Sequence, residues 1–81
     1  MLTELASQDK VVGVKQSRKI IRDGRAQRVY LACDADPAVT APVAESCRCA
    51  EIPVETGCTM AQLGQACGIT VGAAVVTVLR K

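Results

Sequence analysis

Cationic side chains recur between residues 15 and 22 at a spacing that could bind an anionic ligand. They are Lys15, Arg18, Lys19 and Arg22. At about 100° of rotation per residue they share one face of a helix, whereas Ser17, Ile20 and Ile21 fall on the opposite face. Such a run usually marks a solvated helix face, and an anion-binding surface is the functional alternative.

The predicted start of this helix adds hydrogen-bond donors to the charge. Gly13 indicates a turn, so the unpaired N–H groups of the first helical turn should point to where Lys15 and Gln16 reach. Phosphate groups and the acceptors on nucleic-acid bases suit such donors. Arg25 and Arg28 extend the positive region beyond the helix.

The residues needed for catalysis are missing from the pattern. The chain has no histidine, no serine or cysteine has an evident base beside it, and no glycine-rich phosphate loop is present. We therefore expect neither an enzyme nor a cofactor.

The five cysteines are odd in number, which favours reduced thiols over a disulfide framework. Cys47 and Cys49 could form half of a soft-metal site with Cys33 or Cys58, but their spacing is one residue short of Cys-x-x-Cys and no second pair exists. We expect free thiols, with Cys33 and Cys67 buried as packing residues, and no metal.

Composition limits the kind of protein further. A chain of 81 residues is enough for one domain, residues 1–81, and Tyr30 is its only aromatic residue. Stacking of bases on a sheet of aromatic rings is therefore excluded.

Seven of the ten basic side chains lie in residues 1–28, so a localised anionic partner is favoured. No leader and no long apolar run is present, which predicts a cytoplasmic protein without a membrane contact.

Helical and strand patterns alternate along the chain. Helices are expected over 2–8, over 15–23 before Gly24, from Asp36-Pro37 to about Arg48, and from a capping box at Thr59–Gln62 to Gly68. Pro42 predicts a kink or a later start of the third helix. Strands are expected over 11–14, 28–33, 52–54 and 72–79, the last in the middle of the sheet. Met60, Leu63 and Cys67 should form a core stripe in which Gly64 permits close approach. The pattern indicates a three-layer α/β domain.

Four strings carry a resemblance to a known family. They are GVKQSRK at 13–19, DADP at 34–37, IPV at 52–54 and LGQACGITVGAA at 63–74. Together they resemble ribosomal proteins of the L-seven-Ae type, in their short bacterial YbxF-like branch, over nearly the whole chain. The resemblance implies an α/β/α sandwich with a mixed four-stranded sheet of order 1-4-2-3 in which strand 4 is antiparallel.

The resemblance also implies recognition of kink-turns, in which a three-nucleotide bulge beside tandem sheared G·A pairs bends an RNA duplex. Lys15 and Gln16 would read guanine edges, and Lys19 would contact guanine or phosphate. Archaeal members carry Asn-Glu at these first two positions, whereas the bacterial branch carries Lys-Gln. A second contact would come from the loop before the last helix, where Gly57 lacks the expected apolar bulk. The expected RNA-binding residues are Gly13, Lys15, Gln16, Arg18, Lys19, Arg22, Thr56, Gly57 and Cys58.

The partner predicted from the sequence is thus a structured RNA, in ribosomal RNA or a riboswitch, bound by a monomer. A protein-interaction or assembly factor on the same scaffold, with weak RNA affinity, is the alternative. A thiol or zinc module built on Cys47 and Cys49 is a third hypothesis.

Overall fold

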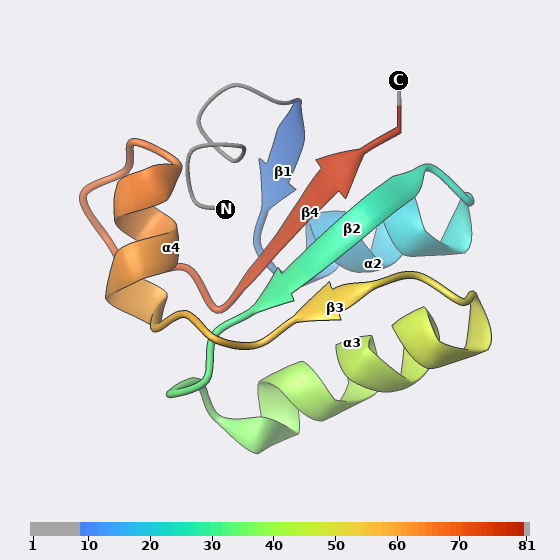
Figure 1. Cartoon of the computed structure of the whole chain (residues 1–81), viewed down its shortest axis with the longest axis horizontal. Coiled ribbons are helices and arrows are strands. Elements are labelled where there is room, and N and C mark those ends of the chain that lie inside the picture. Colours follow the sequence, from blue (N-terminus) through green and yellow to red (C-terminus); the bar gives the residue numbers. More distant parts are fainter. Residues whose placement is uncertain (1–8, 81) are drawn as a thin grey trace.

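The computed structural model describes residues 9–80, so the helix expected over 2–8 lies outside the described residues. Its elements are β1 (Lys10–Val12), α2 (Val14–Arg22), β2 (Ala26–Leu31), α3 (Pro37–Cys49), β3 (Val54–Glu55), α4 (Met60–Ala66) and β4 (Val75–Leu79) (Figure 1). Within residues 9–80, no helix is long and apolar enough to cross a membrane.

The strands form one mixed sheet of order β1-β4-β2-β3. β4 is antiparallel to both β1 and β2, and β2 is parallel to β3. The predicted order and the antiparallel fourth strand are therefore confirmed. β4 is central as expected, because residues 75–78 are all buried and branched side chains fill a strand that is covered on both faces.

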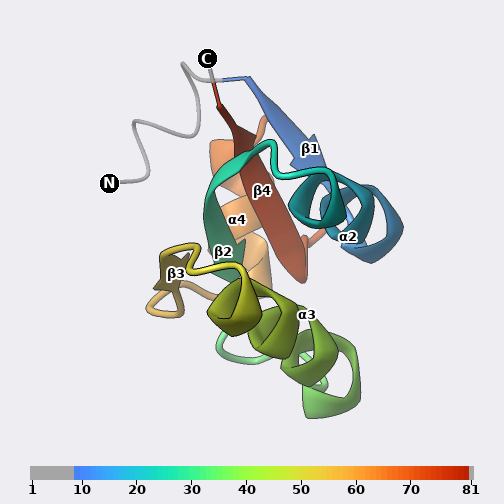
Figure 2. The same ribbon diagram turned by 90° about the vertical axis from the view of Figure 1, so that its right-hand side faces the viewer.

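Helices cover both faces of this sheet, which makes the three layers of an α/β/α sandwich (Figure 2). On one face, Ile20 and Ile21 of α2 and Val43 of α3 pack with sheet residues such as Val29. On the other face, Leu63 of α4 packs with sheet residues that include Tyr30, Val76 and Val78. Tyr30 is 1% exposed, so the only aromatic ring belongs to the core and not to a binding surface.

Several strands have other boundaries than the sequence predicts, because a strand extends only as far as its hydrogen bonds to neighbouring strands. The strand expected over 28–33 is β2, which ends at Leu31. The strand expected from residue 72 begins at Val75, and the one expected over 52–54 is Val54–Glu55. Cys33 lies beyond the end of β2 and is exposed. Its predicted burial is wrong, because the apolar run continues past the point where a helix covers the sheet.

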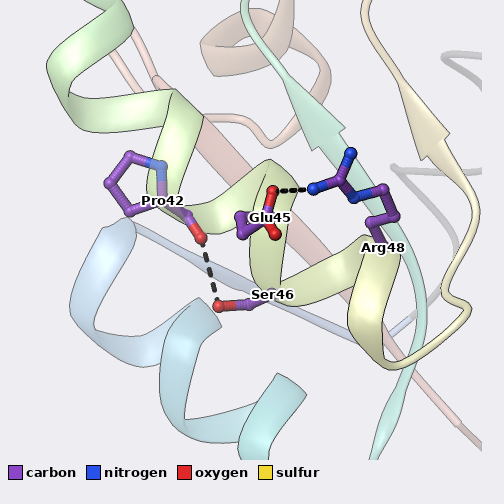
Figure 3. A network of polar contacts seen from close by, with 4 residues as sticks. All are labelled: Pro42, Glu45, Ser46 and Arg48. Carbon is purple, nitrogen blue, oxygen red and sulfur yellow. Dashed lines mark hydrogen bonds and ion pairs between the residues drawn. The ribbon is translucent and has the colours of Figure 1, made fainter.

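The helix ends follow the predicted capping chemistry. Asp36 accepts a hydrogen bond from the Ala38 N–H at 2.9 Å, and α3 begins at Pro37. The helix continues without interruption through Pro42, so a later start is excluded. Pro42 cannot donate to the Ala38 carbonyl, but both residues are exposed, and solvent can satisfy that carbonyl. The Ser46 hydroxyl donates to the Pro42 carbonyl at 3.1 Å (Figure 3).

Candidate nucleic-acid interface

The start of α2 depends on a glycine with an unusual backbone conformation. Gly13 is the N-cap residue and has φ 110° and ψ 157°, which side chains other than hydrogen rarely permit. Its N–H donates to the Val75 carbonyl at 2.9 Å, which ties the helix start to the beginning of β4. No atom lies within 4 Å of where a Cβ would be, so the space above Gly13 is open.

The first turn of α2 leaves backbone donors unpaired within the helix. The first intrahelical hydrogen bond runs from the Ser17 N–H to the Gly13 carbonyl, at 3.1 Å. The N–H groups of residues 14–16 therefore have no helical acceptor. No side chain caps this end, and no acidic residue lies in the first turn. The positive end of the helix dipole is thus not neutralised locally.

The two faces of α2 are divided as the spacing predicts. Ser17, Ile20 and Ile21 are buried. The exposed residues include all the predicted contacts on this helix: Lys15, Gln16, Arg18, Lys19 and Arg22. Because the two isoleucines pack α2 against the sheet, the cations on its opposite face point to solvent.

These cations are largely free of neutralising partners. Within residues 9–80, Arg22 has one carboxylate nearby, with its Nε 4.0 Å from Asp23 Oδ1, and the two side chains are 77% and 43% exposed. At that exposure and distance the pair contributes little. No ion pair of Lys15, Arg18 or Lys19 occurs among the described residues. The face is available to an external anion.

The loop before α4 is held by contacts from a distant part of the chain. The Cys33 N–H donates to the Cys58 carbonyl at 2.8 Å, and Asp34 Oδ1 accepts from the Met60 N–H at 2.8 Å. Thr59 and Gln62 form the predicted capping box, with hydrogen bonds of 2.9 and 3.2 Å. The β2–α3 connection therefore positions this loop.

Within that loop, the predicted contact residues differ in exposure. Thr56 and Gly57 are exposed, and Cys58 is half-buried against the core on the α4 side. Gly57 has no atom within 4 Å of a Cβ position, and its φ is outside the left-handed region. Its lack of a side chain is therefore not imposed by its surroundings.

Asp34 is a positioning residue that sequence reasoning did not single out. Its one sequence signal was membership in the DADP string, where Asp36 was assigned the cap. The partner of Asp34 is 26 residues away, and a contact at that separation has no local pattern.

The strand directions bring the start of α2 and the loop before α4 to one end of the molecule. β1, β2 and β3 all run against β4, so their carboxyl ends meet there (Figure 1). β1 and β3 are the two edges of the sheet. Three strand spacings, about 14 Å, separate them. A ligand that contacts both regions must be larger than a single nucleotide.

The cysteines do not converge on a metal site. Cys47 is buried, whereas Cys49 is exposed, and within the described part of the chain no group of three or more potential ligands is close enough to hold a metal. Burial raises the pKa of the Cys47 thiol and likewise that of Cys67, which is half-buried. Both thiols are therefore poor nucleophiles.

Comparisons of the sequence with known proteins point to one family. The model of the ribosomal protein L7Ae/L30e/S12e/Gadd45 family matches residues 2–81. An RNA-binding protein of Geobacillus sp. strain WCH70 is 43% identical over 70 residues, which are 86% of this chain and 85% of that protein. The RNA-binding protein YbxF of Geobacillus stearothermophilus is 40% identical over 70 residues, again 86% of this chain and 85% of the relative.

A solved structure is similar over almost the whole chain. The Giardia lamblia 15.5kD RNA binding protein superposes with a TM-score of 0.88 at 26% identity, over 99% of this chain and 68% of its own.

Proposed function

The chain belongs to the ribosomal protein L7Ae/L30e/S12e/Gadd45 family, and from this premise we propose that it recognises kink-turns in structured RNA. It is an RNA-binding protein of that family and not an enzyme. Its physiological partner is a ribosomal or riboswitch RNA that contains tandem sheared G·A pairs beside a bulge, and the protein acts on it as a monomer.

The observation that carries this proposal is the unneutralised start of α2. Lys15 and Gln16 are exposed beside backbone N–H groups that lack helical acceptors. A guanine edge presents two acceptors, N7 and O6, to such donors. Lys15 and Gln16 therefore read base edges, and the cations that follow on α2 bind phosphates and position the protein.

The loop of Thr56, Gly57 and Cys58 provides the second contact, with the nucleotides of the bulge. The start of α2 and this loop follow opposite edges of the sheet, which lie about 14 Å apart. A bent duplex is wide enough to contact both, which supports two separate contacts with one RNA. With no side chain at Gly57, this contact is made by backbone groups.

A protein-interaction or assembly role is the second candidate function. It is favoured by Val71, which is 68% exposed in the loop between α4 and β4. Ile69, 36% exposed in the same loop, adds a second apolar side chain, and neighbouring exposed apolar residues suit a protein partner.

The test of the proposed function compares a kink-turn duplex with the same duplex carrying Watson–Crick pairs in place of its G·A pairs. Gln16→Ala and Lys15→Ala should each cost about 1 to 3 kcal/mol on the kink-turn alone. Arg22→Ala should weaken binding to both RNAs equally and reduce the salt dependence by about one contact. Binding constants from gel shifts at fixed salt provide the measurement.

Equal affinity of the unchanged protein for both duplexes would show that it binds RNA through charge alone. If Arg22→Ala abolished discrimination and Gln16→Ala did not, the assigned roles of reader and anchor would be reversed.

A further inference from the structure

A groove of about 640 Å³ lies between α2 and α3. Its α2 wall is formed by Lys15, Arg18, Lys19, Ile21 and Arg22, and its α3 wall by Glu45, Ser46, Cys49 and Ala50. The four cations of α2 therefore do not face open solvent alone. They form one side of a concave surface whose other side comes from the carboxyl-terminal half of α3.

The α3 wall carries little opposing charge. Glu45 is its only carboxylate, and that carboxylate is engaged by Arg48 on the same helix. Figure 3 shows the Glu45 carboxylate directed toward Arg48, which lies on the side of α3 away from α2. The Ser46 hydroxyl lies on the side of α3 that faces α2 (Figure 3). Four cations thus face one partly neutralised carboxylate.

The spacing of the cations suits a ligand with repeated negative charges. At about 1.5 Å per residue, the cations from Lys15 to Arg22 extend over about 10 Å of the helix axis. A single small anion reaches only one or two of them. A backbone that carries one charge per nucleotide can meet Arg18, Lys19 and Arg22 in turn, while Lys15 at the mouth of the groove reaches the base edges.

Continuity with the start of α2 identifies the occupant. Lys15 belongs both to the groove and to the exposed first turn of α2. An RNA whose bases are read there already has its backbone at the mouth of the groove. We propose that the groove between α2 and α3 is a second anchoring site for the RNA sugar-phosphate backbone. In this site, Ser46 and Cys49 on α3 lie against the RNA strand. This inference rests on the proposed function.

Cys49 provides the test, because it is exposed at the last position of α3 and lines the groove. Cys49→Asp adds a negative charge to the groove and should weaken RNA binding roughly three- to tenfold, as expected for one added charge near several cations. Cys49→Lys should strengthen binding by a similar factor. The matched controls are Gln65→Asp and Gln65→Lys, at an exposed position of α4 on the other side of the sheet. Both should bind as the unchanged protein does, and thermal melting verifies that each variant is folded.

Alkylation by N-ethylmaleimide, resolved by peptide mass spectrometry, is the second measurement. RNA should slow the labelling of Cys49 and leave unchanged that of the thiol added by Gln65→Cys, at an exposed position of α4. The proposal is overturned if the Asp and Lys variants of Cys49 bind RNA equally well. It is also overturned if poly-glutamate but not RNA protects Cys49, which would assign the groove to an acidic protein partner.

The groove contacts backbone and not bases, so the Cys49 variants should change the affinity for a kink-turn and for its Watson–Crick control by the same factor. Failure of the proposed function appears instead as the loss of discrimination between these two RNAs in the unchanged protein. The two failures are therefore distinguishable in one set of titrations.

Discussion

Individual glycines of this chain differ in what surrounds them, and that difference decides what a methyl group would do. Gly64 lies inside α4 and is buried. A Cβ there would be 2.1 Å from the Val71 carbonyl oxygen, which is far inside van der Waals contact. Gly57 is in open space. The first glycine is needed for close packing, whereas nothing around the second requires a glycine.

Gly64→Ala should therefore destabilise the protein although alanine favours helices. The gain in helix propensity is at most about 1 kcal/mol, and displacement of the Val71 backbone costs up to about 3 kcal/mol. We expect a net loss of about 2 kcal/mol, measured as a lower urea midpoint. Gly57→Ala is the control and should leave the midpoint nearly unchanged. An unaltered midpoint for Gly64→Ala would mean that the loop at Val71 moves freely.

Gly57→Val should increase the affinity for a kink-turn without changing that for plain duplex RNA. The free space and the permitted φ at Gly57 allow valine without strain, and its side chain would supply an apolar contact to an unstacked base. Burial of a few methyl groups is worth about 1 kcal/mol or more. Titration of both RNAs checks this, and a variant that binds the kink-turn no better would exclude an apolar contact at this position.

Among the elements, α4 shows how a short helix is positioned from outside itself. α4 has seven residues, too few to be stable alone. Its amino end is fixed by its own capping box and by the Asp34 carboxylate, which accepts from the Met60 N–H. The loop with Gly57 ends at this cap. The order of that loop therefore depends on the β2–α3 connection.

Asp34→Ala should loosen the loop before α4. The variant leaves the Met60 N–H without its acceptor and should cost about 1 kcal/mol. The Met60 amide should exchange faster with deuterium, and affinity for a kink-turn should fall. Asp36→Ala is the matched control, because it removes the comparable cap of α3 and should not affect exchange at Met60. Unchanged protection of Met60 in Asp34→Ala would show that the capping box alone fixes the loop.

At the scale of the whole molecule, the residues that stabilise the fold and those predicted to bind RNA lie in different places. The central strand β4 and the layers on its two faces contain the buried residues. The predicted contacts of the interface lie on the loop before α4 and along α2, which starts at the same end of the sheet as that loop (Figure 1). We therefore expect stability and binding to depend on largely different residues.

The free energy of unfolding should fall at alkaline pH because of the buried thiol. Burial raises the pKa of Cys47 above its ordinary value of 9.0, so the folded state keeps a proton that the unfolded state releases. Stability is thus unaffected below pH 9 and decreases above it, by at most about 1.4 kcal/mol per pH unit for this thiol.

Urea unfolding between pH 8 and 10 measures this dependence. Cys47→Ala should flatten it, leaving the contribution of Cys67, whose pKa is also raised. Cys49→Ala, at an exposed position, should leave it unchanged. The same slope in the Cys47→Ala protein would show that other groups cause the alkaline loss.

Local chemistry determined much of this structure from the sequence alone. The division of α2 into a cationic and a buried face follows from the rotation per residue. The caps at Asp36 and Thr59 follow from side chains that reach their own backbone. β4 was identified as central because eight small or branched residues suit a strand covered on both sides. The family resemblance supplied the strand order, which no local pattern contains.

Tertiary structure decided whatever depends on residues far apart in the chain. Cys33 was expected in the core, but its exposure depends on where the covering layers end and not on its apolar neighbours. The bond from Met60 to Asp34 and the groove between α2 and α3 each join segments that lie over twenty residues apart. Side-chain periodicity reports only how neighbours along one element are oriented. Which element lies opposite is set by packing of the whole sandwich, so the second wall of the cationic groove became visible only in the folded molecule.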